Sequence, residues 1–140
     1  LNVDSLRKEI AVVYQDFQSF AFSIGENVLT RELKGNEDEQ EVWEALKASG
    51  LYSKVETLPD KIHTPLTNEF EENGINLSGG ENQKLAIAKA ICKDAGVIIM
   101  DEPSSSLDPL SEHEMYLRMF NMCKDKTLFL FLTACIPRKW

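Results

Sequence analysis

The chain has 140 residues, of which 43% are hydrophobic and 27% charged, a composition typical of one globular domain with an apolar core. Its formal net charge of −8 argues against nucleic acid as a partner, because proteins that bind phosphate backbones cluster Lys and Arg. Three cysteines without a Cys-x-x-Cys pair indicate neither a disulfide framework nor a zinc site, and a reducing cytoplasm fits this pattern best. The apolar run at residues 128–132 is far shorter than the roughly 20 residues of a membrane span, so we expect membrane association only through a partner.

The first half of the chain predicts one strand and two helices. Residues 10–14 form a β-branched apolar run that indicates a buried strand. Residues 38–51 place apolar side chains at helical spacing among acids and lysines, and Gly50 lies near the end like a cap, so we predict an amphipathic surface helix there. A shorter helix is predicted over residues 52–57. Residues 58–76 contain Pro, Gly and acids without clear periodicity, which indicates a loop.

The second half predicts alternating helices and strands. Residues 78–93 carry the strongest helix signal in the chain. Residues 97–100 are continuously apolar, which is typical of a central parallel strand buried on both faces. A helix over about residues 110–123 and another buried strand over residues 128–133 follow. This alternation predicts an α/β fold with a parallel sheet.

Two adjacent acids, Asp101 and Glu102, directly follow the predicted central strand. Open α/β sheets bind their ligands at the carboxyl ends of such strands. In phosphoryl transfer, a first carboxylate there holds Mg²⁺, usually through water, and a neighbouring group positions or activates the attacking water. We predict the first role for Asp101 and the second for Glu102. The alternative is that both acids merely end a strand.

The segment Leu-Ser-Gly-Gly-Glu at residues 77–81 begins the strongest predicted helix. Its two glycines allow the backbone to approach an anion closely, and the N–H groups and dipole of a helix N-terminus favour phosphate. Ser78 and Glu81 also have the spacing of an ordinary capping box. Both interpretations can hold together.

Five segments together resemble the ATP-binding domain of ABC transporters. Residues 77–83 are similar to the signature motif, and residues 97–102 are similar to the Walker B strand. Residues 13–16 resemble the Q-loop, residues 106–108 resemble the D-loop, and residues 69–74 resemble the acidic loop that precedes the signature in exporters. The motifs occur in the family's order and spacing, and the resemblance covers nearly the whole chain.

The resemblance implies an α/β fold, namely a partial P-loop NTPase (RecA-like) parallel-sheet core joined to an ABC helical subdomain. Residues 1–22 would hold the Q-loop strand and loop of the core. Residues 23–93 would form the helical subdomain with the signature motif and its helix. Residues 94–140 would return to the core with the Walker B strand, the D-loop and an aberrant tail.

The resemblance also implies that the chain takes part in ATP binding and hydrolysis as the nucleotide-binding domain of an exporter. The implied cofactors are ATP and Mg²⁺. The implied partners are a second ATP-binding domain, in a head-to-tail dimer, and the transmembrane domains of the transporter, with no nucleic acid. The transmembrane domains would hold the chain at the cytoplasmic face of the plasma membrane and would select the substrate.

Each implied role falls on a residue that matches a motif. Glu102 would activate the attacking water, Asp101 would hold Mg²⁺, and Gln15 would sense both the metal and that water. Signature residues of one subunit would contact the γ-phosphate of ATP held by the other subunit, and Asp108 would reach across to link the two sites. The implied signature contacts are Ser78, Gly79, Gly80 and Glu81.

Two features depart from the family pattern. The 140 residues include neither an adenine-stacking aromatic residue in its usual place nor a Gly-x-x-x-x-Gly-Lys-Ser/Thr phosphate loop, so we expect a fragment that lacks the Walker A loop. The family also has a histidine after the last strand, where this sequence has Thr133. Codons permitted for residues 128–139, read two bases out of frame, can spell a segment with that histidine. We therefore hypothesise a frameshift near Thr127.

Two other hypotheses compete with the exporter. Soluble ABC-type ATPases of DNA repair or chromosome maintenance share the signature and Walker B motifs, but they usually carry long insertions. Here only a compact segment separates Gln15 from Ser78, which argues against that class. The other alternative is an inactive truncated product.

Overall fold

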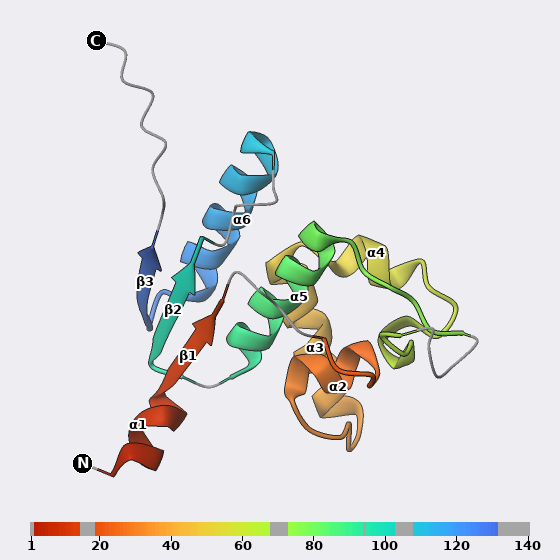
Figure 1. Cartoon of the computed structure of the whole chain (residues 1–140), viewed down its shortest axis with the longest axis horizontal. Helices are drawn as coiled ribbons and strands as arrows, with labels where there is room; N and C mark the ends of the chain where they lie inside the picture. Colours follow the sequence, from red (N-terminus) through yellow and green to blue (C-terminus); the bar gives the residue numbers. More distant parts are fainter. Residues whose placement is uncertain (1, 15–18, 68–72, 94, 103–107, 132–140) are drawn as a thin grey trace.

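The computed structural model describes residues 2–14, 19–67, 73–93, 95–102 and 108–131. Its sheet has three strands, β1 (Ile10–Val13), β2 (Val97–Asp101) and β3 (Thr127–Phe131), in the order β1-β2-β3. Both pairings are parallel, with Val13 opposite Met100 and Asp101 opposite Phe131. The three strands therefore point the same way (Figure 1), which confirms the predicted parallel sheet.

Two helices cover one face of this sheet. Alternate strand residues face α5 (Gly79–Cys92) and α6 (Pro109–Met122), because successive side chains of a strand point to opposite faces. The cluster beneath the helices contains strand residues Ala11, Val13, Ile98 and Met100, helix residues Ile87, Ala90, Met115, Met119 and Cys123, and Ala95. Its members are at most 7% exposed, so they form a closed apolar core.

The opposite face of the sheet is open in the described part of the chain. Val12 is 40% exposed, Phe129 52% and Phe131 59%. The prediction of a buried strand over residues 128–133 is therefore wrong for the described residues 128–131, since β3 half-buries only alternate side chains, Leu128 and Leu130. The central strand is likewise less enclosed than predicted, because Ile99 is only half-buried. Continuous apolar sequence indicated burial on both faces, whereas the described helices pack on one.

A second core lies among the helices. It joins α2 (Ile24–Leu29), α3 (Asn36–Ser49), α4 (Tyr52–Glu56), the 3₁₀ turn η1 (Lys61–His63) and part of α5. Buried members of this core include Ile24, Val42, Leu46, Leu51, Val55, Ile62, Leu85 and Ala88. The predicted amphipathic helix is confirmed as α3, and the predicted short helix as α4.

The end of α3 follows the sequence prediction closely. Gly50 caps the helix with a φ of 79°, a left-handed conformation that favours glycine. Its N–H donates to the carbonyl oxygens of Leu46 and Lys47. The predicted loop after α4 is less irregular than expected, because it contains η1 and a β-bridge between Ser23 and Pro65.

Two helices were not predicted, α1 (Val3–Glu9) and α2. Both are short, with 7 and 6 residues, so neither spans enough turns to display a helical period. A local signal for α2 was present, because Ser23 and Glu26 form a complete capping box. The end of α1 is fastened by Lys93, whose Nζ donates to the carbonyl oxygens of Arg7 at 3.0 Å and Ile10 at 2.6 Å.

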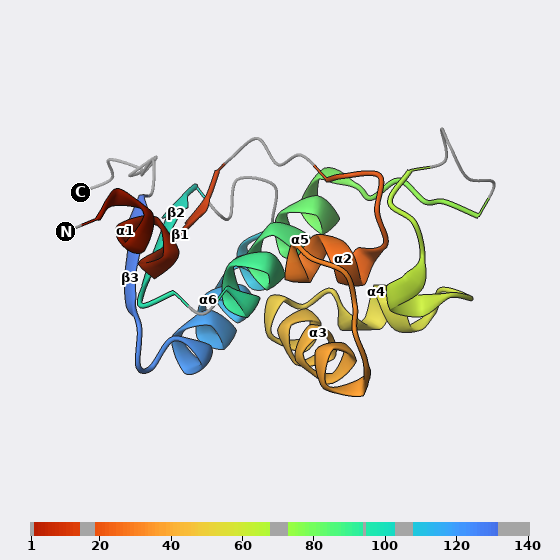
Figure 2. The same cartoon turned by 90° about the horizontal axis from the view of Figure 1, so that it is seen from below.

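Helix α5 lies between the two cores. Figure 2 shows it between the sheet on one side and α2 and α3 on the other. Leu85 and Ala88 belong to the helical core, whereas Ile87 and Ala90 pack under the sheet. The helix that begins at the signature-like segment therefore connects the two halves of the molecule.

Candidate functional site

The paired acids lie at the carboxyl end of the central strand, as predicted. Asp101 is the last residue of β2 and is exposed, and Glu102 follows it with intermediate exposure. Glu102 has a φ of 47°, in the left-handed region that residues with a side chain rarely adopt. Such backbone strain concentrates at functional sites, which makes Glu102 a strong candidate for a chemical role.

The main chain of Glu102 is held on both sides. Its N–H donates to the carbonyl oxygen of Phe131 at 2.9 Å, which extends the β2–β3 ladder by one residue. Its carbonyl oxygen accepts a hydrogen bond from Nε2 of Gln83 at 3.2 Å. These contacts fix the turn at the strand end.

The signature-like segment forms the N-terminus of α5. Ser78 is the N-cap, and its Oγ accepts from the Glu81 N–H at 3.2 Å while the Glu81 carboxylate accepts from the Ser78 N–H at 2.9 Å. The predicted capping box is thus confirmed. A Cβ at Gly79 would meet no atom within 4 Å. The space beside the first turn is therefore open, and a helix N-terminus with that opening can bind an anion.

Glu81 would compete with an incoming anion if its charge were uncompensated. Partial burial acts to raise the pKa of Glu81, but the N–H of Ser78 and the charge of Lys54 outweigh that effect and lower the pKa below its ordinary value. The Lys54 Nζ lies 3.6 Å from the Glu81 carboxylate. The carboxylate is therefore ionised at neutral pH and is neutralised locally by α4.

Asp108, predicted to reach across a dimer, caps α6 in this chain. Its Oδ1 accepts from the N–H groups of Leu110 and Ser111, each at 3.1 Å, and its Oδ2 accepts from the Ser111 hydroxyl at 2.5 Å. The Ser111 side chain, followed by the backbone N–H groups, holds the pKa of Asp108 below its ordinary value. Asp108 remains exposed and ionised.

The predicted site residues gather at one end of the molecule. In Figure 1 the strands point toward the end at which α5 and α6 both begin. Asp101 and Glu102 lie at the tip of β2, Asp108 at the start of α6, and residues 78–81 at the start of α5. Gln15 and Thr133 lie outside the described residues, as do residues 16, 69–72, 106 and 107 of the resembling segments.

The donor set at the tip of β2 fits a hydrated Mg²⁺ ion. Asp101 offers one exposed carboxylate, and magnesium typically binds through one or two carboxylates plus water and phosphate oxygens. Within the described ranges, no group of three or more His, Cys, Asp or Glu side chains gathers to hold a metal by itself. When bound, the ion would neutralise charge on transferring phosphate oxygens.

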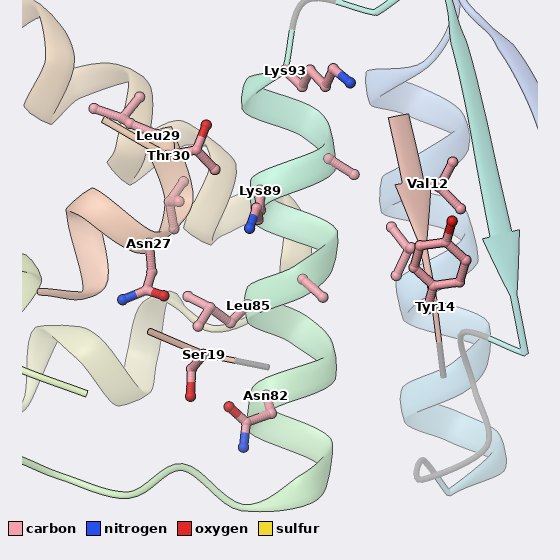
Figure 3. Close-up of a pocket in the computed structure, with 14 residues that line it drawn as sticks. Val12, Tyr14, Ser19, Asn27, Leu29, Thr30, Asn82, Leu85, Lys89 and Lys93 are labelled. Carbon is pink, nitrogen blue, oxygen red and sulfur yellow. The ribbon is translucent and has the colours of Figure 1, made fainter. Parts of the chain in front are cut away.

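One cavity lies away from these acids. It has a volume of about 410 Å³ and opens between β1, α2 and α5 (Figure 3). Figure 3 shows Asn27 and Thr30 on one side of α5 and Val12 and Tyr14 on the other. Residues 78–81, Asp101, Glu102 and Asp108 do not line it. The cavity therefore offers no support for a phosphate site.

Asn27 organises one wall of this cavity. Its Oδ1 accepts from the Phe20 N–H at 2.9 Å. Its Nδ2 lies within hydrogen-bond distance of the carbonyl oxygens of Phe20, Phe22 and Ser23, at 3.0, 3.1 and 3.0 Å. Asn27 is 4% exposed, so its side chain provides the hydrogen bonds that water would otherwise make to these backbone groups.

Gln83 is the site neighbour that the sequence analysis missed. It is wholly buried, on the same helical face as Ile87 and Ala90. The sequence does carry a signal for Gln83, namely a polar residue on an otherwise apolar helix face. A buried amide there needs hydrogen-bond partners from neighbouring elements. The amide of Gln83 contacts Glu102 from the neighbouring strand end.

The chain has the features of part of a P-loop NTPase-type α/β domain. Its strands are parallel, acids lie at the tip of the central strand, and a capped helix N-terminus is open at the same end. The ABC transporter family model matches residues 1–105. The chain belongs to the ABC transporter family. Domains of this family generally bind ATP, typically with Mg²⁺, and the family implies ATPase activity.

Relatives that match most of this chain are named as a flippase and as a transport system ATP-binding/permease protein. An ATP-dependent lipid A-core flippase of Bordetella avium is 38% identical over 127 residues, which is 91% of this chain and 21% of the relative. The glutathione/L-cysteine transport system ATP-binding/permease protein CydD of Bacillus subtilis is 36% identical over 125 residues, 89% of this chain and 21% of the relative. The chain thus spans about a fifth of the length of these relatives.

A solved structure supports the same placement. A bacterial Atm1-family ABC exporter with ATP bound matches 91% of this chain and 22% of its own, with a TM-score of 0.77 and 28% identity. These similarities to transport proteins do not support the alternative of a soluble ATPase of DNA repair. Among the residues that the structure describes, no helix has the length and apolar character to cross a membrane.

Proposed function

We propose that this chain forms the signature and Walker B part of a nucleotide-binding domain that hydrolyses ATP to drive export across a membrane. One observation carries the proposal. The strained Glu102 at the tip of β2 and the open N-terminus of α5 lie toward the same end of a chain that belongs to the ABC transporter family. The domain would comprise core residues 1–22 and 94–140 and helical residues 23–93.

The acids at the strand tip would act on ATP bound by the same subunit. Glu102 would accept a proton from the attacking water as general base, which is a role for a positioned carboxylate. Asp101 would hold Mg²⁺ through water. Gln15 would contact both the metal and the attacking water.

The helix N-terminus would act on ATP bound by the other subunit of a head-to-tail dimer. The N–H groups and dipole at the start of α5 favour the negative γ-phosphate, and the open space at Gly79 admits it. Asp108, exposed at the start of α6, would link the two sites. The phosphate contacts at this face would be made by Ser78, Gly79 and Gly80, while Glu81 would hold Ser78 in place through the capping box.

Two partners follow from this arrangement. A second ATP-binding domain would supply the phosphate loop that faces the signature, and transmembrane domains would hold the assembly at the cytoplasmic face of the plasma membrane. The 140-residue chain alone should bind ATP weakly, because the signature side supplies only part of the contacts. Calorimetry checks this expectation, and micromolar affinity for the isolated chain would contradict it.

Glu102→Gln tests the catalytic assignment in the exporter that carries this sequence. The change keeps the size of the side chain and replaces the carboxylate by a neutral amide, which cannot act as a general base. We expect ATP turnover to fall by at least about 100-fold, the lower range for general-base catalysis, while ATP binding persists. An ATP-stabilised closed dimer should accumulate and is measured by size-exclusion chromatography with radiolabelled ATP.

Glu114→Gln is the matched control. Glu114 lies on α6, where it pairs with Arg118 at 3.0 Å on the helix surface. The same chemical change there should leave turnover unchanged. Normal turnover in Glu102→Gln would show that this carboxylate merely ends a strand.

A further inference from the structure

Gln83 makes a long-range contact that links α5 to the strand tip. Its side chain is 0% exposed, and its Nε2 donates to the main-chain oxygen of Glu102 at 3.2 Å, across 19 residues of sequence. Burying an amide without a hydrogen-bond partner is costly. The bond to Glu102 gives the buried Nε2 such a partner.

The bond acts on a residue whose conformation needs support. Glu102 holds a left-handed φ of 47°, a conformation that is unfavourable for a residue with a side chain and persists only where the surroundings enforce it. The Phe131 carbonyl fixes the peptide before Cα of Glu102, and Gln83 fixes the peptide after it. Together these two bonds determine the direction of the Cα–Cβ bond, and hence where the carboxylate starts.

We infer that Gln83 is a positioning residue for Glu102 and mechanically couples the signature end of α5 to the general base. The inference rests on the function proposed above. Gln83 lies five residues after Ser78, a rise of about 7.5 Å along a rigid helix. A γ-phosphate bound at the start of α5 would thereby be joined, through one side chain, to the carboxylate that serves the other ATP.

Gln83→Met tests the inference in the exporter that carries this sequence. Methionine has nearly the same shape and no N–H donor, so the core stays filled while the bond to Glu102 is lost. We expect kcat for ATP to fall about fivefold to tenfold, the effect of losing one neutral hydrogen bond, with KM for ATP unchanged. The control is Gln40→Met at an exposed position of α3, which should change neither constant.

A double-variant comparison separates positioning from general packing. In a Glu102→Ala background, Gln83→Met should lower residual single-turnover hydrolysis no further, because Gln83 acts only through Glu102. An equal fold-loss in both backgrounds would overturn the inference. So would a normal kcat for Gln83→Met in an active exporter, and the proposed function would then still stand.

Two further outcomes are distinguishable. If the wild-type exporter hydrolyses no ATP, the proposed function fails and this inference fails with it. If Gln83→Met does not fold, the contact is tested by NMR in the wild-type 140-residue chain. A scalar coupling across the hydrogen bond from Gln83 Nε2 to the Glu102 carbonyl carbon supports the inference, and its absence overturns it.

Discussion

Replacing Asn27 by Ala should be among the most destabilising polar changes in this chain. Its two amide N–H groups face the carbonyl oxygens of Phe20, Phe22 and Ser23, and its oxygen accepts from the Phe20 N–H. The two N–H groups can donate about two full hydrogen bonds, and the oxygen accepts one more. The side chain therefore contributes about three hydrogen bonds. At about 1 kcal/mol each, Asn27→Ala should lower the free energy of unfolding by about 3 kcal/mol.

Urea denaturation of the 140-residue chain measures this loss. With a denaturant slope of about 2 kcal/mol per molar, the unfolding midpoint should fall by about 1.5 M. Asn36→Ala is the control, because Asn36 is exposed at the start of α3, and its effect should stay within about 0.5 kcal/mol. A midpoint shift below about 0.5 M for Asn27→Ala would refute the reasoning, since buried backbone groups would then find other partners.

Two further predictions concern backbone and charge. Gly50→Ala should lower the free energy of unfolding, measured in urea, by about 1–2 kcal/mol, because Gly50 has a φ of 79°. The same change at Gly79, a helical position with open space, should leave the free energy of unfolding unchanged or raise it. Equal effects of the two changes would contradict this explanation. Arg31, followed by the Lys34 N–H, lowers the pKa of Asp38 from 3.8 to about 2. Ionised Asp38 therefore stabilises the fold above about pH 4, and this stabilisation is lost as the pH falls toward 2. NMR titration of the Asp38 carboxyl group should show the lowered pKa, and Arg31→Gln should largely restore its ordinary value.

Local patterns in the sequence predicted the elements with strong signals. The apolar period of α3, its glycine cap and the capping box of Ser78 each depend on residues within a few positions of one another. Helix α2 escaped because six residues cannot display a period. The exposure of Phe129 on β3 depends on which elements cover the second face of the sheet, and no local pattern carries that information.

The candidate site was predictable in composition but not in geometry. Asp101 and Glu102 follow an apolar strand, so their place at a strand tip could be read from order alone. The left-handed conformation of Glu102 could not be predicted, because glutamate has no intrinsic preference for that conformation. Its contact with Gln83 depends on how α5 crosses the sheet, which only the three-dimensional structure reveals.

The position of α5 between two cores bears on how the chain unfolds. Leu85 and Ala88 belong to one core, and Ile87 and Ala90 to the other, so neither core survives if this helix melts. We expect both halves to lose hydrogen-exchange protection in a single cooperative step. Dividing the chain after residue 93 would follow the apparent boundary between the helical and strand-bearing segments. It would nevertheless remove α5, one of the two helices that cover the sheet. The unit of folding therefore crosses the boundary between the helical and the strand-bearing halves.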